Sequence, residues 1–178
     1  MSPPAAGYPD DYDAADLDNS PVAHPPRPIN WNILTAAEAA PEWLDLDRWV
    51  TWLRTTFGLP AAVLPPAWHR HDELIWELSA LHTHFLYCYD ASSPPSAPLL
   101  WMRDFADARH RLREWVSTCG TRLDRDRPTH QTVWPGELHL PTSEEAPITD
   151  RAHDFAEFVR EDLTARLRIE SMDTEQST

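Results

Sequence analysis

Histidine and cysteine side chains are the groups in this chain best able to bind a metal, and five of them lie close together in the sequence. His69 and His71 precede a predicted helix that carries His82, His84 and Cys88. A zinc site needs about four such ligands around one point. His84 and Cys88 are one turn apart, but His82 lies about 160° around the helix from His84. Because the ligands divide between two flanks, we expect no bound metal and keep a metal-dependent enzyme built on this His/Cys cluster as an alternative.

Carboxylate pairs and lone nucleophiles make no stronger case for catalysis. Asp104 and Asp107, like Glu73 and Glu77, are spaced to share a helix face. Acid–base catalysis needs carboxylates whose pKa values a cleft shifts apart, whereas nearby arginines favour salt pairs along the helix. Cys88 fits a buried structural cysteine. With four glycines in the whole chain, no phosphate-binding loop can be written. We therefore expect no catalytic residue and no cofactor.

One stretch, residues 109–127, is locally basic, with six arginines against three acids. Arginines interleaved with an aromatic side chain can contact phosphates and stack a base. The interspersed acids and the net charge of -14 weigh against this interpretation. We do not expect nucleic acid as the partner, but a nucleic-acid-associated regulator is kept as an alternative. Its candidate contacts are Arg109, Arg113, Trp115, Arg122, Arg125 and Arg127.

The elements that must position these residues are helices. Apolar side chains recur at helical spacing, without sustained strand-like alternation. Gly58 and Gly120 are typical helix-ending residues, and Thr35 with Glu38 has the pattern of a capping box for a short turn. The sequence thus predicts an all-α fold, a small bundle of three core helices plus a C-terminal amphipathic helix. The predicted helices span residues 41–57, 72–89, 98–118 and 150–169.

Composition divides the chain into three parts. Residues 1–28 hold five acids and one arginine among many prolines, which predicts a disordered acidic tail that aids solubility. Residues 29–140 form the Trp-rich helical domain, with an extended connection expected at 61–68. Residues 141–178 comprise a linker, the amphipathic helix and a disordered end. The segment 121–147 is expected to be loop, without a sheet.

Tryptophan is the most unusual feature of the composition, with nine copies. Most fall on predicted inward faces, among them Trp43, Trp76 and Trp101, so we expect a Trp-heavy core. Trp52 lies off the main apolar stripe of its helix, and an exposed tryptophan there would anchor an interface. The predicted core residues are Trp49, Leu53, Leu78, Phe85, Phe105, Leu112 and Trp115.

The last predicted helix carries a continuous apolar stripe, and a long Pro-rich loop separates it from the bundle. This spacing suits a helix that lays its apolar face in a partner's groove. The alternative is that the same stripe docks on the chain's own core. Together with Trp52, the candidate partner interface consists of Phe155, Phe158, Val159 and Leu163.

Two motifs and a tryptophan pair resemble a known family. Residues 66–74 read PAWHRHDEL and lead into an aromatic-rich helix, and residues 101–107 read WMRDFAD. With Trp49 and Trp52, these motifs are similar to an uncharacterised actinobacterial family of small Trp-rich proteins, a domain of unknown function, over about residues 45–120. Members are commonly encoded on plasmids, phages and conjugative elements. The resemblance therefore implies a genomic context rather than a chemistry.

The sequence departs from that family at 117–120, which read STCG where the family often has Gly-Pro-Phe ahead of a cysteine. No apolar run approaches the roughly 20 residues needed to cross a bilayer, and two cysteines make no disulfide framework, so we expect a cytoplasmic protein. We interpret the chain as a non-catalytic protein-interaction or accessory factor of a mobile element, linked to conjugative transfer. A protein partner is expected, and a homo-oligomer is the other form of association considered.

Overall fold

The computed structural model describes residues 26–130, 132–138 and 144–176. Over these residues the chain forms four α-helices, one 3-10 turn and a pair of two-residue strands. The predicted all-α class, with core helices followed by a C-terminal helix, is confirmed. Most of the predicted acidic tail, residues 1–25, lies outside the described residues.

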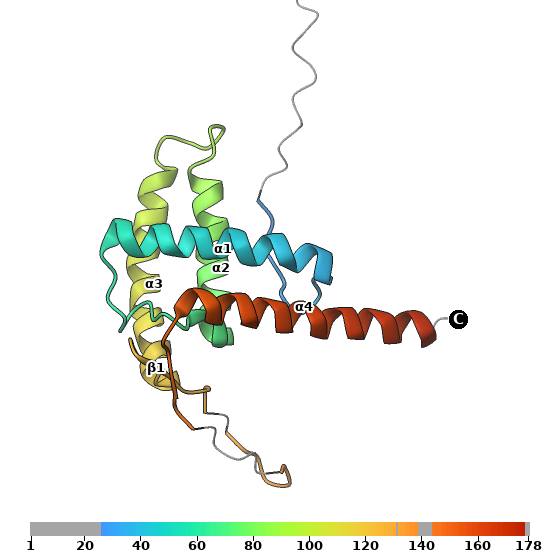
Figure 1. The fold of residues 1–178 in the computed structure, drawn as a ribbon. Coiled ribbons are helices and arrows are strands. Elements are labelled where there is room, and N and C mark those ends of the chain that lie inside the picture. The colour runs from blue at the N-terminus through green and yellow to red at the C-terminus, as the bar shows by residue number, and fades with distance from the viewer. Residues whose placement is uncertain (1–25, 131, 139–143, 177–178) are drawn as a thin grey trace, which may run out of the picture.

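The helices are arranged as two crossed pairs. The elements are α1 (Ala36–Phe57), η1 (Trp68–Arg70), α2 (Asp72–Cys88), α3 (Ala97–Cys119), β1 (Arg125–Asp126), β2 (Ala146–Pro147) and α4 (Arg151–Gln176). Figure 1 shows α2 and α3 side by side and antiparallel, with α1 lying across them. α4 runs alongside α1 in the opposite direction. The turn η1 therefore sits where the two pairs meet, in contact with both α2 and α4.

Helix α1 begins earlier than the sequence pattern predicts. The predicted capping box is present, because Glu38 N–H donates to Thr35 Oγ1 at 3.2 Å and Thr35 N–H donates to the Glu38 carboxylate at 2.9 Å. From Ala36 the helix runs through Pro41 without a break. Pro41 removes the hydrogen bond to the Ala37 carbonyl, but both residues are exposed, so water can reach that carbonyl. The predicted start at the proline is wrong, and the short turn is the first turn of the helix.

The core contains most of the predicted inward residues. α2 and α3 pack closely on each other, and α1 covers them from one side. Phe85 is half-buried against this core, and Tyr89, predicted inward, is exposed. The predicted core residues that are buried are Trp49, Leu53, Leu78, Phe105 and Leu112.

Two tryptophans expected inside lie on the surface. Trp115 is 42% exposed and Trp76 is 39% exposed, so their assignment to inward faces is wrong, whereas Trp43 is buried as predicted. By the 100° rule Trp115 has the same angle around α3 as the buried Ala97, so helical spacing alone does not explain its exposure. The buried residues of α3 are Ala97, Trp101, Phe105, Ala108, Leu112, Val116 and Cys119.

The apolar stripe of α4 docks on the chain's own core, which corrects its assignment as a partner-facing surface. Phe155 is 6% exposed and belongs to the core, and Phe158, Val159 and Leu163 pack partly buried against it. Trp43 of α1 is the main contact, with its ring centroid 5.3 Å from that of Phe158 and 6.4 Å from that of Phe155. Phe155 therefore stabilises this chain and is not available to bind a partner.

Helix α4 is also longer than predicted. It is capped by Asp150, whose carboxylate accepts from the N–H groups of Ala152 and His153, and it continues to Gln176 instead of ending at 169. Near its end, the Glu170 carboxylate accepts from Ala36 N–H at 2.6 Å, where a helix N-terminus attracts an anion. Among the described helices, none is both long and apolar enough to cross a membrane.

The two segments expected to be irregular contain more structure than the sequence suggests. Residues 61–68 form turns rather than an extended connection, with Val63 N–H donating to the Pro60 carbonyl at 2.8 Å. Within 121–147, β1 pairs with β2 in antiparallel register, so the expectation of no sheet is wrong for these four residues.

Candidate functional site

The structure distributes the predicted His/Cys cluster over four places. His82 stacks on a tryptophan of α1 with ring centroids 4.8 Å apart. His84 Nδ1 lies 3.6 Å from the Cys88 sulfur. His69 and His71 are buried on either side of η1. The predicted separation of His82 from His84 is confirmed, as is the burial of Cys88, but the residues lie in four places rather than on two flanks.

Turn η1 places two buried histidines two residues apart. It is closed by hydrogen bonds from Arg70 N–H to the Ala67 carbonyl and from His71 N–H to the Trp68 carbonyl. A 3-10 turn has three residues per turn, so side chains two residues apart point in different directions. His69 accordingly faces α4, and His71 faces the segment after α3.

The His69 side of the turn fastens α4. His69 Nε2 lies 2.8 Å from Asp154 Oδ2, and the Arg70 guanidinium donates to both oxygens of the same carboxylate at 2.5–3.2 Å. His69 Nδ1 is buried with no hydrogen-bond partner in the described part of the chain. Burial lowers the pKa of His69 to about 4, against the opposing effect of Asp154. The ring is therefore neutral at pH 7.

The His71 side of the turn fastens the segment after α3. His71 Nε2 lies 2.8 Å from Asp126 Oδ1, and Nδ1 lies 2.9 Å from Thr129 Oγ1. Thr129 in turn donates to Glu73 Oε1 at 2.7 Å. Burial by itself lowers the pKa of His71, but the hydrogen bond to Asp126 and the neighbouring Cys119 outweigh it and raise the pKa to about 9. His71 is therefore a buried imidazolium at pH 7.

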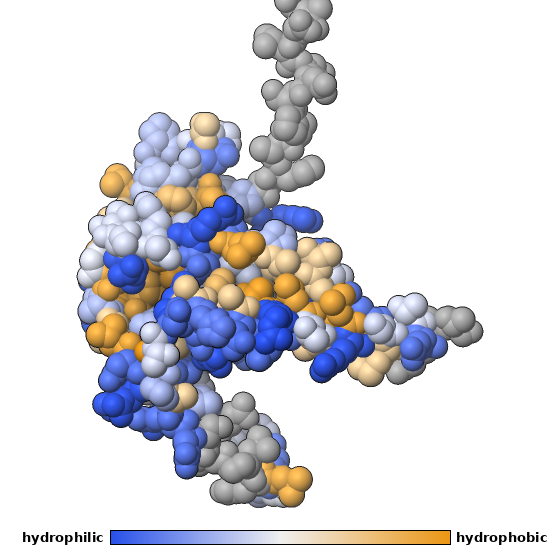
Figure 2. Space-filling view, viewed as in Figure 1, coloured by the Kyte–Doolittle hydropathy of each residue, from blue (hydrophilic) through white to orange (hydrophobic). Residues whose placement is uncertain are grey.

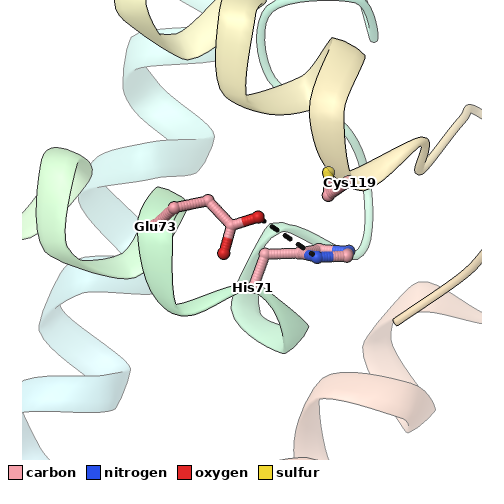
Figure 3. A group of neighbouring side chains, drawn as sticks. All are labelled: His71, Glu73 and Cys119. Atoms are coloured by element: carbon pink, nitrogen blue, oxygen red, sulfur yellow. Dashed lines mark ion pairs between the residues drawn. The ribbon is translucent and has the colours of Figure 1, made fainter. Parts of the chain in front are cut away.

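Three side chains of metal-binding type meet on this side of the turn. His71, Glu73 and Cys119 each offer one ligand atom, and these atoms lie within 4.8 Å of one another. Figure 3 shows them approaching one another from the beginning of α2 and the end of α3. Cys119 has no exposed surface and His71 is 1% exposed, so a substrate in solution cannot reach the sulfur. The arrangement suits an enclosed ion better than a catalytic thiol.

A separate pocket of about 440 Å³ opens between α1, the loop that follows it and the start of α4. Its lining is mainly apolar, including Leu64 and Trp68, and Arg54 and Arg151 supply positive charge. Arg151 is already paired with Asp47. None of the three metal-type ligands lines this pocket, so it is independent of the histidine site.

The candidate nucleic-acid contacts do not form one surface. Trp115 and the arginines other than Arg127 are exposed. At about 100° per residue, Trp115 points roughly 120–160° away from Arg109 and Arg113 around α3. Arg125 is paired with Glu145. Arg127 is half-buried and donates to the carbonyl of the last residue of α3. The structure thus separates the stacking residue from the cations that would accompany it.

A continuous group of aromatic rings reaches the surface between α1 and α2. We call Trp52, Phe57, Phe85 and Tyr89 the aromatic strip. The ring centroid of Trp52 lies 5.0 Å from that of Phe85 and 6.0 Å from that of Phe57, and Phe85 lies 4.5 Å from Tyr89. Trp52 is 38% exposed and Tyr89 is 48% exposed. Trp52 is thus exposed, and its role in an interface stays a prediction.

The residues that sequence reasoning missed are those distant from their partners along the chain. Cys119, Asp126 and Thr129 come at least 48 residues after His71, and no periodicity links positions so far apart. In the sequence, Glu73 stands out only as half of a carboxylate pair with Glu77. No family model matches this chain, and comparisons with curated proteins and with solved structures find no match.

Proposed function

We propose that this chain is a non-catalytic protein-interaction module that binds a protein partner through the aromatic strip, with Trp52 as the anchor. The observation that supports the proposal is that Trp52 stays 38% exposed while rings on two sides hold it. Figure 2 shows hydrophobic and hydrophilic side chains interspersed on the face it displays. A defined aromatic patch is therefore a better candidate for specific recognition than general hydrophobicity.

The physical argument rests on residue type and rigidity. Tryptophan and tyrosine contribute more binding energy at protein interfaces than most other residues. Tyr89 contacts both Phe85 and the buried Trp101, with centroids 4.5 and 6.0 Å away. Because packed neighbours already restrict these rings, binding costs little side-chain entropy. The strip is thus suited to act as a preorganised binding surface.

The cellular setting comes from the resemblance to the actinobacterial family. It supports an accessory factor of a mobile element acting in the cytoplasm, with conjugative transfer as the process. The burial of His71 and Cys119 supports a non-catalytic role, because neither of these reactive groups faces solvent.

The test compares two exposed tryptophans. Trp52→Ser removes the anchor, and Trp115→Ser is the matched control because Trp115 is 42% exposed but lies on α3 outside the strip. The tagged full-length chain and both variants would capture partners from an actinobacterial cell that carries the gene, and the captured proteins would be quantified by mass spectrometry. We expect at least one protein to be recovered equally with wild type and Trp115→Ser and depleted more than tenfold with Trp52→Ser.

Thermal midpoints of the three proteins would show whether Trp52→Ser still folds. Equal recovery with Trp52→Ser would contradict the proposal. Salt-sensitive recovery of DNA that depends on Trp115 would favour the nucleic-acid alternative. Loss of self-association in sedimentation, with no other protein recovered, would identify the partner as a second copy of this chain.

A further inference from the structure

We propose that His71, Glu73 and Cys119 bind a structural zinc ion that joins the beginning of α2 to the end of α3. This inference does not rest on the proposed protein-interaction function. It also differs from the expectation of no metal, which rests on the cluster of His69, His71, His82, His84 and Cys88. The tertiary structure offers a different set of ligands.

The chemistry of the donor set suits zinc. Zinc takes thiolate sulfur, imidazole nitrogen and carboxylate oxygen at about 2.0–2.3 Å, so adjacent ligand atoms of a tetrahedral site lie about 3.3–3.7 Å apart. Here the three ligand atoms lie within 4.8 Å of one another, and His71 Nδ1 is 4.0 Å from Glu73 Oε1. A shift of about 1 Å would bring these atoms to that spacing and fill three of the four tetrahedral positions, leaving the fourth to a water molecule. Calcium and magnesium prefer oxygen ligands throughout, and a buried cysteine is unsuited to them.

A second carboxylate already orients the histidine. Asp126 Oδ1 lies 2.8 Å from His71 Nε2, which leaves Nδ1 as the ligand atom. Metal-bound histidines commonly donate their other ring N–H to a carboxylate, which fixes the ring and strengthens the ligand. Thr129 Oγ1 now bridges His71 Nδ1 and Glu73 Oε1, and zinc would replace that bridge.

Besides its interaction with His71, the Cys119 side chain makes little use of its sulfur. Its only hydrogen bond to backbone in the described chain is a 3.6 Å contact with the Val116 carbonyl, which is weak because S–H is a poor donor. Gly120 follows with φ 77°, and a Cβ there would meet the end of the Arg127 side chain. That guanidinium also donates to the Cys119 carbonyl. The positive φ favours glycine beside the cysteine, and Asp126 reaches the site through its contact with His71.

The experiment uses cobalt as a spectroscopic substitute for zinc. The full chain, stripped with EDTA and kept reduced, would be titrated with Co²⁺ alone and the complex then challenged with Zn²⁺. We expect one cobalt per chain, a thiolate-to-cobalt charge-transfer band in the near ultraviolet, and complete displacement by one equivalent of zinc. Absence of this band in the wild type would overturn the proposal without any variant.

Two pairs of variants identify the ligands. Cys119→Ser should abolish the band, whereas Cys88→Ser, which changes the other buried cysteine, should retain it. His71→Gln should weaken zinc binding more than tenfold, and His84→Gln should leave it unchanged. Asp126→Asn should weaken binding about 10–100-fold with the stoichiometry unchanged, as expected for an orienting partner.

Folding of each variant would be checked by circular dichroism. If Cys119→Ser does not fold, Glu73→Gln serves in its place, because the Glu73 side chain is 15% exposed and should tolerate the change; it should weaken zinc binding more than tenfold. A band lost with Cys88→Ser but retained with Cys119→Ser, or an affinity unaffected by Glu73→Gln, would overturn the assignment of these ligands.

Discussion

The two sides of η1 differ in charge although they are built from the same groups. His69 and His71 are both buried, and each has a carboxylate oxygen 2.8 Å from Nε2. The pKa of His69 is nevertheless lowered to about 4, while that of His71 is raised to about 9. A neutral ring therefore faces α4, and a charged ring faces the segment after α3.

The other partners of the carboxylate and the ring account for the difference. Asp154 shares its charge with the guanidinium of Arg70, and His69 Nδ1 has no hydrogen-bond partner in the described chain to stabilise a second proton. At His71 the hydrogen bond to Asp126 and the neighbouring Cys119 outweigh burial and raise the pKa, and Thr129 lies 2.9 Å from the second ring nitrogen. A buried histidine is thus charged when both ring nitrogens have hydrogen-bond partners and the neighbouring carboxylate is not paired with another cation.

The largest expected loss of stability comes from a substitution in the packing around His69. Phe155 lies edge-on to His69 with centroids 5.2 Å apart and is buried in the core. Phe155→Ala should lower the free energy of unfolding by about 3–5 kcal/mol. Leu167→Ala, an exposed position on the same helix, should change it by less than about 0.5 kcal/mol. Urea denaturation would measure both, and equal effects would mean that α4 does not dock on the core.

The pH dependence of stability should carry opposite signs for the two histidines. His69 has a folded pKa of about 4, below its unfolded value of about 6.5, so the unfolded chain takes up the proton first and stability falls as pH drops from 6.5 to 4. The loss should approach roughly 3 kcal/mol. His71 has a folded pKa of about 9, so its contribution is complete below pH 6.5 and is lost as pH rises through 9.

Urea denaturation at pH 4 to 9.5, with EDTA present to exclude metal, would measure the two arms of the profile: the loss of stability at acid pH and the loss at alkaline pH. His69→Gln keeps a donor for Asp154 and should flatten only the acid arm, when its profile is compared with that of wild type. Two arms that respond equally to this variant would refute the assignment of separate charges.

A smaller effect should follow from removing the charge that holds His71. Asp126→Asn should cost about 1–3 kcal/mol at pH 7, because it leaves a buried ring without its anion. The cost should shrink above pH 9, where His71 loses its proton in the wild type as well. Asp124→Asn, an exposed neighbour, is the control and should stay within about 0.5 kcal/mol of wild type.

The smallest expected effect is a shift of the pKa of His69 toward that of His71. Arg70→Gln removes the guanidinium that shares Asp154, a partly exposed pair worth about 1 kcal/mol or less. Because Arg70 lowers the pKa of His69, the variant should raise that pKa, which NMR titration of the ring would detect. An unchanged pKa would show that burial alone sets the neutral state.

Local sequence patterns were sufficient to predict most helix boundaries but not to predict which residues lie on the surface. The α2 and α3 boundaries match the apolar periodicity closely, and Thr35 with Glu38 marks the start of α1. Periodicity could not distinguish Trp115, which lies next to the buried face of α3, from a core residue. It also could not decide whether the α4 stripe packs in the same chain, because that depends on the position of Trp43.

The sequence by itself determined the helical class, the caps and the split of the histidines, since these depend on residues within a few turns of one another. Only the tertiary structure decided which charges meet. Asp154 reaches His69 across 85 positions, and Asp126 reaches His71 across 55. Contacts over such distances arise from the crossing of two helix pairs, and no local spacing encodes them. The protonation of both histidines, and the convergence of Cys119 and Glu73 on one of them, follow from that crossing.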